Sequence, residues 1–128
     1  MRCATEDAPD DCAVDANEFL RYNWYIMPML NPDGYEYTWT DDRAWRKNLF
    51  QGENPLCTGV DLNRNCDVGF GTQGSSDNPC SNSYHGTGPF SEPEIQAWKS
   101  AFQYGIATTS HVFAYVGVHS YSQVRTNY

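Results

Sequence analysis

The sequence lacks any long apolar run and any leader of the secretory type. Nowhere does it hold the roughly 20 consecutive apolar residues that a membrane-spanning helix requires. Its first 15 residues are acidic and interrupted by proline. A secretory signal instead begins with basic residues and continues with about 7–15 apolar ones. We therefore expect no membrane span, and any export signal would lie upstream of Met1.

Basic residues are scarce. The chain has 8 Lys and Arg against 16 Asp and Glu, which gives a formal net charge of -8 at pH 7. A surface of this sign repels phosphate backbones and anionic membranes. The composition therefore argues against nucleic acid as a partner.

The cysteines lack the close Cys-x-x-Cys spacing of structural zinc sites and thioredoxin-type motifs. There are five of them: Cys3, Cys12, Cys57, Cys66 and Cys80. Disulfides formed in an oxidising compartment are the better interpretation, so we expect a secreted protein. The odd number implies an intermolecular bond, a free thiol or a partner outside this segment, and we favour the last.

Aromatic residues are abundant, at 15% of the chain, while only 19% is charged, which is typical of a folded domain. Two runs, 22–30 (YNWYIMPML) and 112–118 (VFAYVGV), are apolar on both faces and predict buried strands. Between them, Ser91 and Glu94 match a capping box and predict a helix that ends at Gly105. This order indicates an α/β fold with a mixed, largely parallel sheet and flanking helices.

The remaining segments are expected to be turns and long ordered loops. Asn-Pro-Asp-Gly at 31–34 predicts a turn, because proline fixes φ and glycine supplies a positive φ. Residues 35–56 show no clean period, and residues 66–90 are rich in Gly, Ser, Asn and Pro. A disulfide between Cys57 and Cys80 would close a loop of about 24 residues and stabilise the fold by roughly 3 kcal/mol.

Several side chains could carry chemistry. His119 follows the second apolar run directly, and ligands in open α/β sheets bind beyond the carboxyl ends of strands. Taken alone, this position favours a hydrogen-bonded structural histidine over a metal ligand. Asn63 and Arg64 are suited to holding a carboxylate. For Arg43, Arg46 and Arg64 taken singly, a surface ion pair explains the residue at least as well.

The joint pattern resembles a known family. Four motifs occur in order, NPDGYEYTWTDDRAWRK, CTGVDLNRNCDVGFG, NPCSNSYHGTGPFSEPE and GVHSYSQ, as in the zinc carboxypeptidases of the pancreatic A/B type. The resemblance runs from about Asn17 to Gln123. It implies a partial zinc carboxypeptidase catalytic domain over residues 17–128, after an irregular acidic segment at 1–16.

The resemblance also implies roles for individual residues. His119 matches the last zinc ligand, and Arg46 matches the residue that polarises the scissile carbonyl and stabilises its oxyanion. Asn63 and Arg64 match the pair that holds the free C-terminal carboxylate of a peptide substrate.

Further matches carry less specific roles. Arg43 and Tyr121 would line neighbouring substrate subsites. Asp61 resembles the carboxylate that orients a zinc-bound histidine. Cys57 and Cys80 match the loop disulfide of the family.

The chain also departs from the family pattern. The family uses a His-x-x-Glu pair upstream, whereas no histidine here precedes His85, so two of three zinc ligands are lacking. The family's general-base Glu follows the HSYSQ motif at a distance, but this chain ends at Tyr128. Cys66 stands where an aromatic residue is usual. These departures predict an incomplete zinc site, in a truncated gene product or a partial gene.

The resemblance implies zinc-dependent hydrolysis of C-terminal amino acids from peptides, with this chain inactive on its own. A second hypothesis is a non-catalytic carboxylate-binding or interaction module, because the residues that bind carboxylate are present while the zinc site is incomplete. A third is a small secreted disulfide-bonded domain without a ligand.

Overall fold

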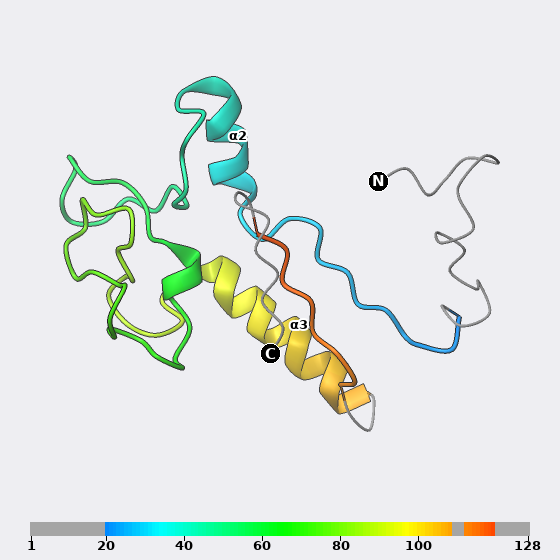
Figure 1. Cartoon of the computed structure of the whole chain (residues 1–128). Coiled ribbons are helices and arrows are strands. Elements are labelled where there is room, and N and C mark those ends of the chain that lie inside the picture. Colours follow the sequence, from blue (N-terminus) through cyan, green and yellow to red (C-terminus); the bar gives the residue numbers. More distant parts are fainter. Residues whose placement is uncertain (1–19, 109–111, 120–128) are drawn as a thin grey trace.

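The computed structural model describes residues 20–108 and 112–119. Its helices, shown in Figure 1, are α2 (Pro32–Thr40), the short 3₁₀ helix η2 (Leu62–Arg64) and α3 (Pro93–Thr108). None of the described helices is long and apolar enough to cross a membrane. The predicted segment 1–16 lies outside the described residues.

Residues 31–34 begin helix α2 instead of forming the predicted turn. Asn31 is the N-cap, and its Oδ1 accepts a hydrogen bond of 3.0 Å from the Gly34 backbone N–H. Pro32 occupies the first helical position, where its lack of an N–H does no harm. Gly34 is buried, and a Cβ there would collide with the backbone carbonyl of Lys47. Glycine is therefore needed for a close approach, not for a positive φ.

Helix α3 confirms the predicted helix and continues to Thr108. The predicted capping box does not form in the expected way. The Ser91 hydroxyl donates to Glu92 Oε1 at 2.8 Å and lies 2.8 Å from Asn65 Nδ2, which donates to it. Ile95, in the first turn, is 2% exposed and anchors the helix in the core.

The predicted sheet is not formed by the described residues. The runs 22–30 and 112–118 contain no strand there, although the Tyr22 and Phe113 rings stack with centroids 5.6 Å apart. Most of their large side chains are exposed, including Ile26 at 77% and Val118 at 92%. A buried strand needs paired backbone and cover on both faces, which the described part of the chain does not supply to these runs.

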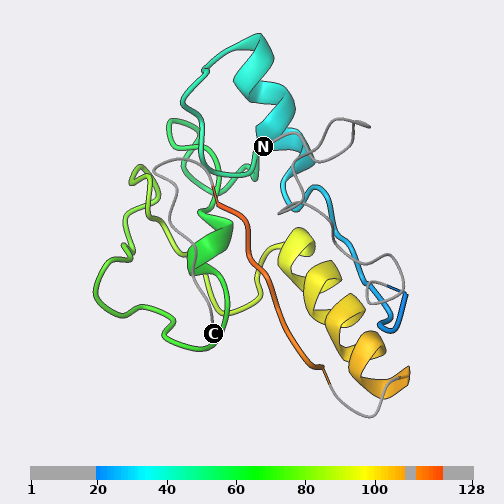
Figure 2. The same ribbon diagram turned by 45° about the vertical axis from the view of Figure 1, so that its right-hand side comes forward.

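The second run nevertheless packs along α3. The Tyr115 ring meets the rings of Trp98 and Phe102 edge-on, at centroid distances of 6.2 and 6.3 Å. Figures 1 and 2 show this segment, in orange, returning beside α3 toward the helix's N-terminal end.

The core lies around η2 and the start of α3. Its buried apolar residues are Cys57, Val60, Leu62 and Ile95. A larger set of buried polar side chains, each at most 3% exposed, is called the polar framework below: Lys47, Asn48, Asp61, Asn65 and Glu92. The structure confirms the predicted Cys57–Cys80 disulfide, which closes the loop that contains η2.

Candidate functional site

A buried carboxylate, Asp61, gathers three of the predicted site residues. Its Oδ1 accepts a 3.1 Å hydrogen bond from the Asn63 backbone N–H and so caps η2. Its Oδ2 accepts from Arg46 Nε at 3.0 Å and lies 2.9 Å from Arg46 Nη2. Arg64 Nε is 4.0 Å from the same oxygen. Asp61, Arg46, Asn63 and Arg64 are called the Asp61 cluster.

The arginines of the Asp61 cluster remain accessible while their counter-ion is buried. The side chain of Arg46 is 45% exposed and that of Arg64 is 35% exposed, against 3% for Asp61. Arg64 also donates from Nε to Gly74 O at 2.9 Å and from Nη1 to Asn63 O at 3.2 Å. Both guanidinium groups are thus held by the protein on one side and open to a ligand on the other.

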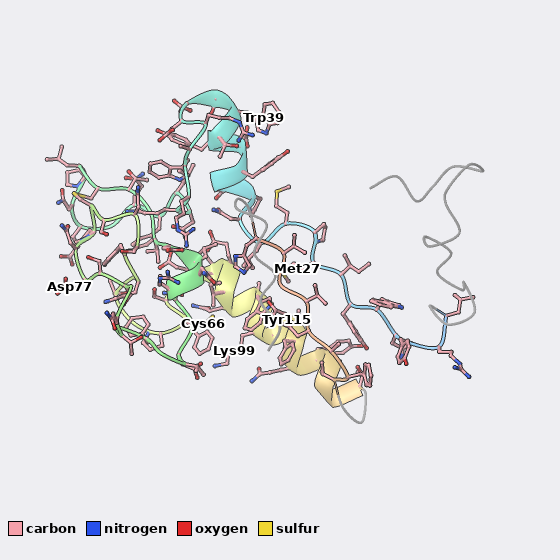
Figure 3. All side chains as sticks on the ribbon, in the orientation of Figure 1. Met27, Trp39, Cys66, Asp77, Lys99 and Tyr115 are labelled. Atoms are coloured by element: carbon pink, nitrogen blue, oxygen red, sulfur yellow. A yellow bond between two sulfur atoms is a disulfide. The ribbon has the colours of Figure 1, made fainter. Side chains whose placement is uncertain are left out.

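A cavity of about 240 Å³ lies beside Arg64. Polar side chains dominate its wall, which is formed by Asn63, Arg64, Cys66, Val68, Gly69, Thr72, Gln73 and Ser75. Figure 3 labels Cys66 close to η2, and this cysteine is free. Burial raises the pKa of the Cys66 thiol, and the neighbouring Asp67 carboxylate raises it further. A raised pKa favours the neutral thiol, which is the less reactive form.

Two buried asparagines connect the segment that carries the Asp61 cluster to Glu92. Asn48 Oδ1 accepts from the Val60 backbone N–H at 2.7 Å, and its Nδ2 donates to Glu92 Oε2 at 2.7 Å. Asn65 Oδ1 accepts from the Glu92 backbone N–H at 3.1 Å. These bonds tie both flanks of η2 to the start of α3.

The sequence did not predict the buried hydrogen bonds of Asn48 and Asn65. Buried asparagines follow no helix or strand period, so no pattern marks Asn48 or Asn65 as interior. Their only signal is the density of Asn in the motifs that also contain Arg46 and Arg64.

In residues 20–108 and 112–119, no hydrogen bond or ion pair joins Arg43 to the Asp61 cluster. The Arg43 guanidinium is exposed and sits 5.6 Å from the Trp39 ring centroid. His119 is exposed at the end of segment 112–119, and no hydrogen bond or ion pair joins it to the cluster among the described residues. Tyr121 lies outside the described residues.

The described residues do not fit a zinc site by themselves. Within them, no group of three or more His, Cys, Asp and Glu side chains is placed to hold a metal. The described partners of the Asp61 carboxylate are Arg46, Asn63 and Arg64, so its role beside a zinc-bound histidine stays a prediction. An accessible guanidinium group that is held in place can donate hydrogen bonds to a carboxylate or to a developing oxyanion.

A sequence model described as "Zinc carboxypeptidase" matches residues 16–128. The chain belongs to the zinc carboxypeptidase family. It is 42% identical to mast cell carboxypeptidase A of Rattus norvegicus over 81% of this chain and 24% of the relative. It is 46% identical to carboxypeptidase B2 of Bos taurus, over 86% of this chain and 26% of that relative.

Solved structures agree with this assignment. The crystal structure of thrombin activatable fibrinolysis inhibitor matches with a TM-score of 0.75 and 44% identity, covering 84% of this chain and 26% of that one. The chain thus spans about a quarter of the length of these relatives. Because the solved relatives have an α/β fold, the predicted fold class is confirmed, while the arrangement of its sheet stays a prediction.

Proposed function

We propose that this chain supplies the carboxylate-binding residues of a carboxypeptidase site that acts on peptide C-termini. The observation that carries the proposal is the convergence of Arg46, Asn63 and Arg64 on the buried Asp61. The family supports the wider activity, which is zinc-dependent hydrolysis of C-terminal amino acids.

The geometry favours recognition of an anionic group. Guanidinium groups bind carboxylates through two parallel N–H donors, and such charge-assisted bonds are about twice as strong as neutral ones. Asp61 holds Arg46 before a ligand arrives, so less side-chain freedom is lost on binding. We assign the terminal carboxylate to Asn63 and Arg64, and the carbonyl of the scissile bond to Arg46. Arg43 and Tyr121 are proposed to line neighbouring subsites.

Zinc, when bound, would activate a water molecule in a site of this family. His119 is the residue here that we propose as one of its ligands. The three histidines of the chain, His85, His111 and His119, are not part of any His-x-x-Glu pair. Because hydrolytic zinc sites use three protein ligands, we propose that a polypeptide of residues 1–128 binds peptides without cleaving them.

A non-catalytic carboxylate-binding module is the second candidate. The Asp61 cluster favours it, because the cluster is complete in the described residues while no metal-binding group accompanies it there. The Cys57–Cys80 disulfide supports an oxidising, extracellular location for either function.

Binding and cleavage are tested separately on refolded residues 1–128. An N-acetyl dipeptide with a free carboxylate should bind, whereas its C-terminal amide should not. Arg64→Met should weaken the binding about tenfold, a change equivalent to roughly 1.4 kcal/mol. Lys99→Met removes a positive charge from α3 and serves as the control. Equal binding of acid and amide would contradict the carboxylate site, and chelator-sensitive release of C-terminal residues would contradict the proposed lack of cleavage.

A further inference from the structure

Lys47 is a buried cation that the proposed function does not use. The residue is 3% exposed, and no carboxylate lies within ion-pair distance of its Nζ in residues 20–108 and 112–119. Burial lowers the pKa of the Lys47 ammonium, and the charge of Asp61 partly offsets this shift. Burying an ammonium group costs free energy of folding unless its N–H donors have hydrogen-bond partners. The partners of the Lys47 ammonium group are therefore informative.

The contacts of the Lys47 ammonium group all lie on one loop. Its Nζ donates to the backbone carbonyl of Pro79 at 2.6 Å and to that of Ser81 at 3.3 Å. These two carbonyls flank Cys80, which is bonded to Cys57. The Nζ also lies 5.7 Å from the ring centroid of Tyr84. Lys47 therefore anchors the loop 79–81 at the place where the disulfide also holds it.

The backbone of Lys47 is held equally firmly. Its carbonyl accepts a 3.0 Å hydrogen bond from Asn31 Nδ2 at the start of α2. The next residue, Asn48, donates its N–H to Val60 O at 3.0 Å. A Cβ on Gly59 would lie 2.9 Å from Lys47 Cβ, so the two segments pack without a gap. The stretch around Lys47 is thus held by Asn31, by segment 59–60 and by loop 79–81.

Arg46 directly precedes this fixed point and reaches into a different environment. The side chain of Lys47 is buried, whereas that of Arg46 is 45% exposed and bonded to Asp61. We propose that Lys47 is a positioning residue: its anchorage on loop 79–81 fixes the backbone from which Arg46 reaches Asp61. Because the task of Arg46 is itself proposed above, this inference rests on the proposed function.

The test measures Arg46 directly and needs no ligand. In the oxidised 1–128 chain, hydrogen exchange of the Arg46 Nε–H reports its bond to Asp61 by NMR. Lys47→Met keeps the apolar stem and removes the donors, and should speed this exchange about tenfold by freeing the local backbone. Lys47→Arg, which retains charge and donors, should restore slow exchange to within about twofold of the original rate. Ile95→Val is the matched control, because it removes one methyl group from the core at α3 and leaves the Lys47 donors to loop 79–81 in place.

Outcomes separate this inference from the proposed function. The positioning role is supported if the Arg46 Nε–H exchanges faster in Lys47→Met but not in Ile95→Val. The comparison is made where both variants shift the unfolding midpoint by the same amount. Unchanged exchange in a folded Lys47→Met overturns it, whatever ligands bind. If Lys47→Met does not fold, Lys47→Gln decides. Its amide nitrogen is uncharged and sits on a shorter side chain, so it should give an intermediate rate, and an unchanged rate overturns the role. Loss of preference for acid over amide in the unsubstituted chain would instead contradict the carboxylate site alone.

Discussion

The polar framework and the two apolar runs are built on opposite principles. The framework, Lys47, Asn48, Asp61, Asn65 and Glu92, is buried and hydrogen-bonded. The runs 22–30 and 112–118 have an interior composition, yet most of their large side chains are exposed. Polar side chains thus share the interior with Val60, Leu62 and Ile95, because each polar group finds a specific partner, while the apolar side chains of the two runs lack cover and stay exposed.

The disulfide offers the strongest way to break the framework. Replacing Cys57 and Cys80 with serine releases the ring around η2, and we expect the free energy of unfolding to fall by about 2–4 kcal/mol. Denaturant titration followed by tryptophan fluorescence measures the change. Cys66→Ser is the control, because Cys66 is free and should change stability by less than about 0.5 kcal/mol.

A single asparagine tests whether hydrogen bonds carry the framework. Asn48→Ala leaves the Val60 N–H and a Glu92 carboxylate oxygen without their buried partner, which should cost about 2–3 kcal/mol. The exposed Asn82→Ala is expected to be neutral. The same denaturant titration applies, and equal effects of the two variants would contradict the importance assigned to Asn48.

Lys47 sharpens the comparison through pH. Because its pKa is lowered in the folded state, the unfolded chain holds this proton to higher pH. Between the lowered folded pKa and the ordinary lysine pKa of about 10.4, stability should therefore rise with pH relative to Lys47→Met. A neutral amine keeps two N–H donors, enough for Pro79 and Ser81. Unfolding titrations of both proteins from pH 7 upward test the sign, and a falling difference would contradict it.

The apolar runs should respond least in stability. Ile26→Lys and Val116→Lys alter side chains that are 77% and 76% exposed, so the free energy of unfolding should change by less than about 0.5 kcal/mol. Self-association and binding of an apolar dye should fall, because each substitution adds a charge to an exposed apolar run. Leu56→Lys, at 90% exposure outside the runs, is the control. Light scattering that is unchanged in the run variants would show that these residues do not cause association.

Local patterns in the sequence predicted the local features of the structure. The helix from Pro93 depends on the spacing of nearby apolar residues, and the disulfide depends on the single pair Cys57 and Cys80. Both were predicted. Residues 31–34 misled because Asn, Pro and Gly suit both a turn and a helix start. The contact of Gly34 with the distant Lys47 carbonyl decides between the two.

Features that depend on distant partners could not be predicted in this way. Two of the family motifs led to the prediction that Arg46, Asn63 and Arg64 are site residues, but no period or motif indicated that Asp61 would pair with Arg46, 15 residues away. The composition of runs 22–30 and 112–118 predicted strands, yet a strand exists only where another strand pairs with its backbone. Such pairing depends on which other segment lies beside the run, and the sequence of the run does not specify that segment.

The position of the disulfide also affects what a protease could do to this molecule. Any single cut between Cys57 and Cys80 leaves the two pieces covalently joined. If the cut falls in the exposed glycine-rich stretch after Arg64, the piece that begins before Arg46 still carries the entire Asp61 cluster. A nicked molecule would therefore migrate as one species on a non-reducing gel and separate only when the sulfur bond is reduced.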